Sequence, residues 1–292
     1  MDISIIIPFY KRIDQLHQLL TSIKKSLLQL SIGKQVQLIV VIDSIENTTE
    51  EIHQICDFHF QDLQFVHLLL LKNEQNLGVA KSRNHALLSA RGTFLHFIDQ
   101  DDEIEIDFYP KVFDALQLSD FVLVNGFFRP PNPKKQYKIF YFEPELTFKN
   151  LILDDFVRSP GQVVFKSSLV QGMLFPETNL HKGCDDRFMW ILLFLHHPAI
   201  KATYVKQALY IAHLHANNFG SDSQQLMACS AEVWANFSSF NFGSNQKFVE
   251  ENKKVIQFIL GQNKSFANRL LFLKYKYRLN RTVRYLIKLA KQ

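Results

Sequence analysis

The chain has 292 residues, of which 47% are hydrophobic and 21% are charged. This length is enough for one large domain or two modest ones with a real core, and the composition is typical of a globular protein. No run of about 18 uncharged apolar residues is present, so we expect no membrane-spanning helix.

The net charge of +5 is unevenly distributed. After Glu251 the sequence has no acidic residue and eleven Lys and Arg, which leaves a net charge of −6 on residues 1–251. A mildly acidic body therefore carries a basic C-terminal segment.

Cysteine usage and the first residues favour the cytoplasm. Cys56, Cys184 and Cys229 are widely separated, and their spacing matches neither a disulfide framework nor a zinc site. The opening Met1-Asp2-Ile3-Ser4 lacks the basic leader of a secretory signal. We expect a cytoplasmic protein, with peripheral attachment to the inner membrane face left open.

Buried-looking apolar runs alternate with amphipathic segments in the first hundred residues. The expected strands are 3–7, 36–42, 63–71 and 94–98, and helices are expected at 13–27, after a capping box formed by Thr48 and Glu51, and at 79–90. This alternation predicts βαβ units, and therefore an α/β fold with a mostly parallel sheet and helices on both faces.

Polar residues follow three of these strands, namely Tyr10, Asp43 and the acidic cluster that begins at Asp99. In open parallel sheets, ligands bind beyond the carboxyl ends of the strands. These residues therefore mark the edge of the sheet where a binding site is expected.

The cluster contains three carboxylates, Asp99, Asp101 and Asp102, directly after an apolar run. Asp99 and Asp101 point roughly the same way on an extended backbone, and without a partner each raises the pKa of the other. A hard cation such as Mg²⁺ or Mn²⁺ removes this penalty. On the triplet alone, however, a solvated loop that caps the following helix is the simpler interpretation.

The pattern loosens after residue 116. A strand is expected at 121–124, followed by a Pro-rich basic loop at 129–135 that is either a surface connection or a flap over a site. The last seventy or so residues are expected to be helical.

Five motifs, in order, resemble the family 2 glycosyltransferases of the GT-A fold. They are SIIIPFYKR (4–12), IVVIDSIENTT (39–49), NLGVAKSRNHAL (76–87), FIDQDD (97–102) and LFPETNLHKGCDDRFMW (174–190). The resemblance covers residues 3–215 and implies a Rossmann-like GT-A catalytic domain over 1–215, with a helical extension over 216–292.

The resemblance also implies an activity. It is the metal-dependent, inverting transfer of a sugar from a nucleotide diphosphate sugar, with UDP favoured, to a hydroxyl of a glycan or lipid-linked acceptor. The expected setting is the synthesis of cell-surface polysaccharide or lipooligosaccharide.

The donor and metal residues follow from the same motifs. Pro8, Phe9 and Tyr10 would shape the base pocket, and Asp43 would accept a hydrogen bond from the imide N–H of uracil. An Asx-turn or a helix cap accounts equally well for Asp43 on local grounds. The resemblance assigns further donor contacts to Arg12, Asn76, Gly78, Lys81, Arg83, Asp99 and Gln100, and the Mn²⁺ or Mg²⁺ ligands to Asp99, Asp101, Asp102 and His215.

The acceptor side of the resemblance centres on Asp185 and Asp186. Asp186 matches the catalytic base, and Asp185 would help to position the acceptor, although simple helix capping is the alternative for both. An Arg that the family often carries near residue 213 is missing here, so His213 or His215 would take its place.

Two further questions stay open on the sequence. The basic segment 266–292 interleaves Leu and Tyr with cations, which suits either an anionic membrane surface or a helical cap on the catalytic domain. No nucleic-acid recognition motif is present.

Two rival functions remain. One is a sugar nucleotidyltransferase, although the Gly-rich phosphate loop typical of that class is missing after the first strand. The other is a non-catalytic carbohydrate-binding or scaffold protein.

Overall fold

The structure is a computed structural model that describes residues 1–31, 33–131, 136–177, 184–214, 223–237, 240–262 and 264–273. The chain divides into two compact units. Unit 1 comprises residues 1–139, 158–175 and 199–215, and unit 2 comprises residues 140–157, 176–198 and 216–292. The division of the chain at residue 215 into a catalytic domain and a helical extension stays a prediction.

Unit 1 is built on one sheet, which has nine strands among the described residues, in the order β3-β2-β1-β4-β8-β6-β9-β5 with β7 added to β6. The strands are β1 (Ile3–Phe9), β2 (Val36–Ile42), β3 (Val66–Lys72), β4 (Phe94–Phe97), β5 (Glu103–Ile104), β6 (Phe121–Arg129), β7 (Tyr137–Lys138), β8 (Val163–Lys166) and β9 (Ala202–His213).

The sheet is parallel from β3 to β4, as the alternating pattern predicts. Both β1 and β2 lie in the core, and their apolar residues are almost completely buried, as expected for strands with helices on both faces. β8 then pairs antiparallel with β4 and with β6, and β6 pairs parallel with β9.

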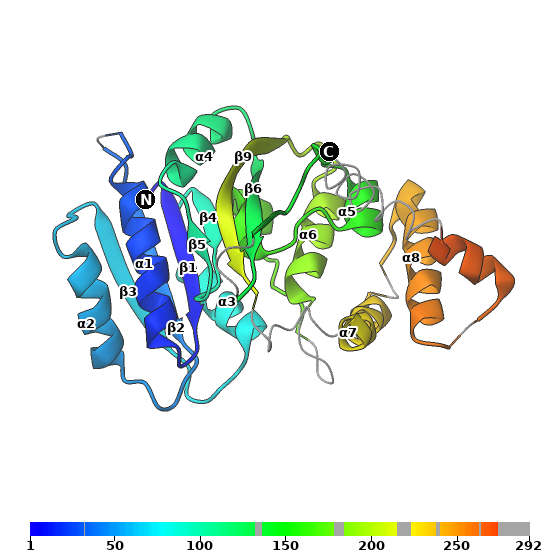
Figure 1. Cartoon of the computed structure of the whole chain (residues 1–292), viewed down its shortest axis with the longest axis horizontal. Coiled ribbons are helices and arrows are strands. Elements are labelled where there is room, and N and C mark those ends of the chain that lie inside the picture. The colour runs from blue at the N-terminus through cyan, green and yellow to red at the C-terminus, as the bar shows by residue number, and fades with distance from the viewer. Residues whose placement is uncertain are drawn as a thin grey trace. The chain divides into compact units, whose positions relative to one another are not determined.

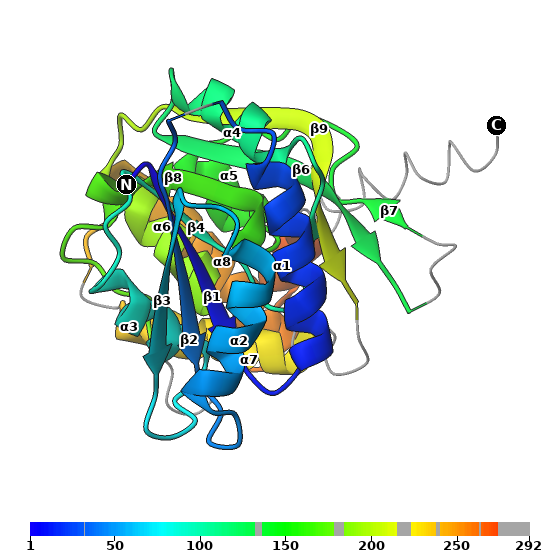
Figure 2. The same cartoon turned by 90° about the vertical axis from the view of Figure 1, so that its left-hand side faces the viewer.

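Among the described residues, four helices accompany the sheet: α1 (Ile13–Leu27), α2 (Thr49–Phe60), α3 (Val79–Leu87) and α4 (Phe108–Leu116). α1 and α2 lie side by side on one face of β1 to β3, and α3 packs on the other side of these strands (Figures 1 and 2). Right-handed crossovers require this arrangement, because the chain reverses its direction of travel across the sheet after β3. The predicted fold class is confirmed.

Local hydrogen bonds explain where the predicted boundaries hold or shift. The hydroxyl of Thr48 accepts the N–H of Glu51 at 3.1 Å, so the predicted cap opens α2. β3 starts at Val66 instead of Leu63, because Leu63 lies in a turn in which its own N–H bonds back to the chain. α3 ends three residues early, where the exposed Leu88 no longer contacts the core.

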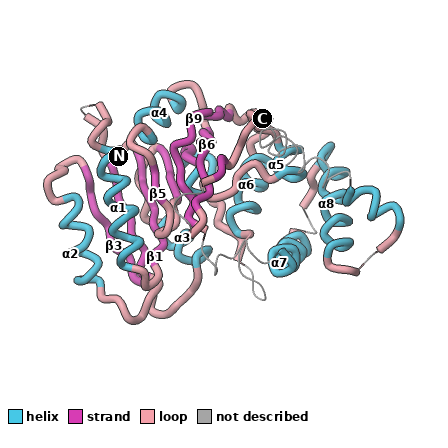
Figure 3. Tube along the Cα trace, in the orientation of Figure 1, coloured by secondary structure: helices cyan, strands magenta, loops and turns pink. Residues whose placement is uncertain are grey.

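The described part of unit 2 is helical (Figure 3). Its labelled helices are α5 (Phe148–Asp154), α6 (Asp185–His196), α7 (Ser223–Asn236) and α8 (Gln246–Ile259), and residues 266–273 are also helical. The described residues also include three short 3₁₀ turns: η1 (Pro160–Gln162) and η2 (Ser167–Val170) in unit 1, and η4 (Gly243–Asn245) in unit 2.

Aromatic packing holds the helices of unit 2 together. The ring of Phe188 on α6 lies 4.9 Å from the Trp234 ring on α7. Trp234 donates its indole N–H to Asn252 on α8 at 3.0 Å, and Asn252 donates to the carbonyl of Ile152 on α5 at 3.0 Å. Each buried polar group in this chain of contacts therefore has a partner. Over the described ranges, no helix combines the length and apolar character that a membrane span requires.

Candidate active site

Three predicted site segments meet at one edge of the sheet in unit 1. β1, β2 and β4 are parallel and in register, with Phe9 opposite Ile42 and Ile6 opposite Phe97. The residues that follow these strands, Tyr10, Asp43 and Asp99, therefore lie along the same carboxyl edge.

The turn after β1 is held by the side-chain amide of Gln100. The amide nitrogen donates to the carbonyl of Tyr10 at 3.0 Å, and the amide oxygen accepts the N–H of Tyr10. The Tyr10 side chain is 44% exposed, whereas the ring of Phe9 is fully buried in the core. Tyr10 is thus the aromatic ring of this pair that is available for stacking, and Gln100 holds the backbone beneath it.

The remaining residues of this turn are only partly covered. Lys11 has a positive φ of 64° and pairs with Glu46 at 2.7 Å. Arg12 is mostly exposed and lies 3.4 Å from Asp14, and Pro8 is partly buried. The turn thus carries two cations near its surface.

Asp43 is buried and anchors the loop that precedes α3. One of its carboxylate oxygens accepts the side-chain N–H of Asn73 and the backbone N–H of Leu77, each at 2.8 Å. The other accepts the backbone N–H of Gly78, also at 2.8 Å. Gly78 lies directly before α3 with a φ of 87°, a conformation that favours glycine. Asp43 therefore ties the end of β2 to the start of α3, whether or not it also contacts a base.

The residues of the 76–87 motif differ in their exposure. Asn76 and Lys81 are exposed, whereas Arg83 on α3 is 97% buried. The guanidinium of Arg83 lies 2.6 Å from the Asp99 carboxylate and 5.5 Å from the centroid of the Phe175 ring. Arg83 thus joins α3 directly to the acidic cluster.

Asn84, the neighbour of Arg83, holds a different segment. Its side chain accepts the N–H of Phe175 at 2.7 Å and donates to the carbonyl of the same residue at 3.0 Å. A side-chain amide that bonds both backbone groups of one residue fixes that residue firmly, so the role of Asn84 is structural.

The three acids after β4 occupy different environments. Asp99 and Asp101 are partly exposed, whereas Asp102 is 94% buried. Burial raises the pKa of Asp102 well above its usual range, and the negative charges of Asp101 and Asp99 add to the shift. The Asp102 carboxylate accepts a hydrogen bond from the hydroxyl of Tyr210 and lies 3.5 Å from the hydroxyl of Ser159.

The carboxylates are suitable ligands for a hard cation, but they do not form a closed cage. Among the described residues, no three His, Cys, Asp or Glu side chains are grouped closely enough to hold a metal ion. His215 lies outside the described residues. Mg²⁺ is commonly bound by one or two carboxylates together with substrate phosphates. The negative charges of Asp99 and Asp101 disfavour ionisation of the neighbouring Asp102. These two partly exposed carboxylates fit an open site of that kind.

The imidazole of His213 pairs with Glu103, whereas the backbone of His213 hydrogen-bonds Asp102. Its Nε2 lies 2.6 Å from the Glu103 carboxylate, which also lies 3.4 Å from Arg129. The hydrogen bond from His213 lowers the pKa of Glu103. The His213 side chain is therefore part of a polar cluster that joins β5, β6 and β9. The sequence did not single out Glu103, Ser159 or Tyr210, since nothing local marks a tyrosine inside an apolar strand as a partner of a distant acid.

Asp185 and Asp186 belong to unit 2, in the first turn of α6. Asp185 is buried, while Asp186 is partly exposed and accepts the N–H of Arg187 at 2.8 Å. Helix α6 follows Cys184, which has a left-handed backbone (φ 62°) and provides no side-chain cap. Two acids in the first turn suit the positive end of the helix dipole. Of the pair, Asp186 is the more exposed residue.

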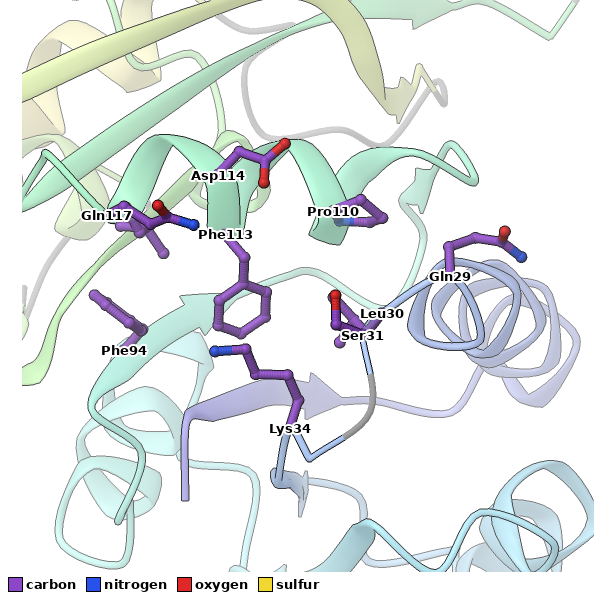
Figure 4. Close-up of a pocket in the computed structure, with 10 residues that line it drawn as sticks. Gln29, Leu30, Ser31, Lys34, Phe94, Pro110, Phe113, Asp114 and Gln117 are labelled. Atoms are coloured by element: carbon purple, nitrogen blue, oxygen red, sulfur yellow. The ribbon is translucent and has the colours of Figure 1, made fainter.

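A pocket of about 210 Å³ lies at the opposite edge of the sheet in unit 1 (Figure 4). It is lined by Phe94, where β4 begins, whereas the acids follow the end of that strand. The Lys34 amine lies 4.7 Å from the centroid of the Phe113 ring in this pocket. The pocket is therefore separate from the edge of the sheet that carries the candidate site residues.

Comparisons with known proteins agree with this arrangement. The model of the family described as Glycosyl transferase family 2 matches residues 4–170. A search of curated proteins found no match.

Several solved structures share the fold. Residues 1–349 of S. aureus TarS in complex with UDP-GlcNAc give a TM-score of 0.66 at 19% identity, covering 94% of this chain and 79% of that one. The complex of the same protein with UDP gives 0.64 at 20% identity, covering 88% and 70%. The mannosyltransferase PcManGT from Pyrobaculum calidifontis, in complex with GDP-Man and Mn²⁺, gives 0.55 at 13% identity, covering 95% and 80%.

Proposed function

This chain belongs to glycosyl transferase family 2 and is a glycosyltransferase, and we propose that it transfers a sugar from a UDP-sugar to a hydroxyl of a glycan or lipid-linked acceptor. One observation carries the proposal: an exposed aromatic ring, a buried arginine and a cluster of carboxylates lie along one edge of the sheet. These are the groups that recognise a base, a diphosphate and a cation.

The donor binds along that edge. Tyr10 stacks on the base, and Arg83 pairs with diphosphate oxygens through a planar guanidinium. Arg83 is already oriented by Asp99. The complexes of S. aureus TarS with UDP and UDP-GlcNAc support a uridine nucleotide.

A divalent cation is part of the donor complex in this proposal. Asp101 and Asp99 would hold this cation, and it would supply positive charge to stabilise the departing diphosphate. The Mn²⁺ in the PcManGT structure supports this requirement.

Asp186 serves as the general base. It removes the proton from the acceptor hydroxyl as that oxygen attacks the anomeric carbon on the face opposite the diphosphate. A single displacement of this kind inverts the anomeric centre. Asp185 orients the acceptor.

We further propose that the acceptor lies at the inner membrane face and that the reaction belongs to the synthesis of cell-surface polysaccharide or lipooligosaccharide. Helical residues 266–273 expose Phe266, Leu270 and Leu273 at helical spacing. The basic segment that follows them carries no acid. An apolar face combined with cations suits an anionic lipid surface.

The test is nucleotide-dependent thermal stabilisation. We expect UDP with Mn²⁺, at about 100 times its dissociation constant, to raise the melting temperature by about 5 °C or more. GDP, CDP and UDP with EDTA should give smaller shifts. D101N should remove the Mn²⁺ effect, whereas D114N, which changes an exposed acid at the other edge, should retain it. If no nucleotide shifts the wild-type melting temperature with Mn²⁺, the proposal is wrong.

A further inference from the structure

Asp102 differs from the other two acids in that it faces the interior of unit 1. Its side chain is 94% buried, whereas Asp99 and Asp101 are partly exposed. The backbone N–H of Asp102 also donates to the carbonyl of Asp99 at 3.1 Å, which closes the turn that carries all three acids. Whatever holds Asp102 therefore also holds the turn.

Two hydroxyl groups hold Asp102 together with the backbone of His213, and both hydroxyls come from distant parts of the sequence. The hydroxyl of Tyr210, on β9, donates to one oxygen of the Asp102 carboxylate. The hydroxyl of Ser159, next to η1, lies 2.6 Å from the Tyr210 hydroxyl and 3.5 Å from the same carboxylate oxygen. The three groups form a closed triangle in which the Tyr210 hydroxyl can accept from Ser159 while it donates to Asp102.

The position of the Tyr210 ring is fixed by two glycines. A Cβ at Gly161 would lie 2.5 Å from the ring carbon Cε2 of Tyr210. A Cβ at Gly126, opposite Tyr210 on β6, would lie 3.0 Å from ring carbon Cδ1 and would overlap the Tyr210 carbonyl. The pairing of β6 with β9 shifts register on either side of Asn125, directly before Gly126. The backbone is therefore shaped to admit this ring, with its hydroxyl directed at Asp102.

We propose that Tyr210 and Ser159 are positioning residues of the donor site, which act through Asp102 to hold the acidic turn in the shape that a metal-bound diphosphate requires. This inference rests on the proposed function. Asp102 then serves as the anchor of the turn, and Asp99 and Asp101 are the acids that face the cation. Residues that orient ligating side chains typically change metal affinity by about 10- to 100-fold when they are removed.

The experiment compares Y210F with Y109F by calorimetric titration of UDP, once with Mn²⁺ and once with EDTA. Y210F removes one hydroxyl and keeps the ring that fills the space beside the glycines. Y109F is a matched control, because Tyr109 is also fully buried and its hydroxyl also contacts a buried polar side chain, His96 at 3.1 Å.

We expect Y210F to weaken UDP binding in Mn²⁺ by about 10-fold and to leave the affinity in EDTA within about 2-fold of wild type. Y109F should match wild type in both buffers. S159A provides a second variant that perturbs the fold less, since Ser159 is only partly buried, and it should show a weaker effect in the same direction.

Three results would overturn the inference. The first is wild-type affinity in Mn²⁺ for both Y210F and S159A. The second is an equal loss with and without Mn²⁺, and the third is an equal loss in Y109F, because either would mean that the hydroxyls contribute only to general stability. Failure of the wild-type protein to bind UDP with Mn²⁺ is a different outcome, and it would refute the proposed function itself.

Discussion

The Asp43 carboxylate offers a sharp test, because its predicted role in base recognition and its observed structural role lead to different results on substitution. In D43N, the side chain keeps one carbonyl oxygen and gains an NH₂ group in place of the other oxygen. Three N–H donors point at this carboxylate, from Asn73, Leu77 and Gly78, each at 2.8 Å. At least one of them must then face another donor.

The magnitude follows from that lost bond. A hydrogen bond to a charged group contributes about 1.5–3 kcal/mol, and a buried donor left without an acceptor costs about 1–3 kcal/mol. We therefore expect D43N to lower the free energy of unfolding by about 2–3 kcal/mol. D14N is the control: Asp14 is an exposed acid whose partner, Arg12, is also exposed, and changes at such sites usually stay within about 0.5 kcal/mol.

Urea denaturation of wild type, D43N and D14N measures these differences, and UDP titration of the same samples measures the effect on the donor site. Suppose that the free energy of unfolding of D43N lies within about 0.5 kcal/mol of wild type, yet D43N binds UDP at least 10-fold more weakly. The reasoning from the three hydrogen bonds would then be refuted, and Asp43 would serve the base alone.

Three further predictions concern catalysis, pH and the basic segment. D186N should lower kcat by about 10²- to 10⁴-fold with little change in the UDP dissociation constant; unchanged steady-state turnover would exclude Asp186 as the base. His96 is fully buried, and burial lowers its pKa to about 4, whereas in the unfolded chain its pKa is about 6.5. The free energy of unfolding should therefore fall as the pH drops from about 6.5 to 4, because the unfolded chain binds this proton first. Urea titrations at pH 7 and 4.5 should show a smaller fall for H96Q than for wild type, and equal falls would contradict this assignment. Deleting residues 274–292 removes seven of the eleven C-terminal cations and should weaken binding to anionic vesicles by about 10-fold or more in sedimentation assays at low salt; equal, salt-insensitive binding would end the membrane proposal.

The parallel half of the sheet was predictable because its signals are local. The first three apolar runs between residues 3 and 98 are each followed by a helical segment, and this alternation predicts parallel strands joined by right-handed crossovers. The antiparallel strand β8 was not predictable, because its neighbours β4 and β6 lie far away in the sequence. β6 likewise runs past the predicted 121–124 to Arg129, since pairing with β9 extends it.

The candidate site was likewise predictable only in part. The motifs identified which residues lie at the edge of the sheet, and the structure places Tyr10, Asp43 and Asp99 there. The sequence could not show which acid of the triplet faces inward, because a turn of four residues can direct its side chains in several ways. Nor could it show that both oxygens of Asp43 already accept hydrogen bonds from the loop before α3.

The contact between Tyr210 and Asp102 joins residues 108 positions apart, and this separation has a consequence for biosynthesis. During translation the carboxylates leave the ribosome well before the strand that braces them. A nascent chain that has already paired β1, β2, β3 and β4 would carry the acids without this brace. The Mn²⁺-dependent part of the nucleotide affinity that we propose would therefore be complete only after β9 has been synthesised and inserted beside β6.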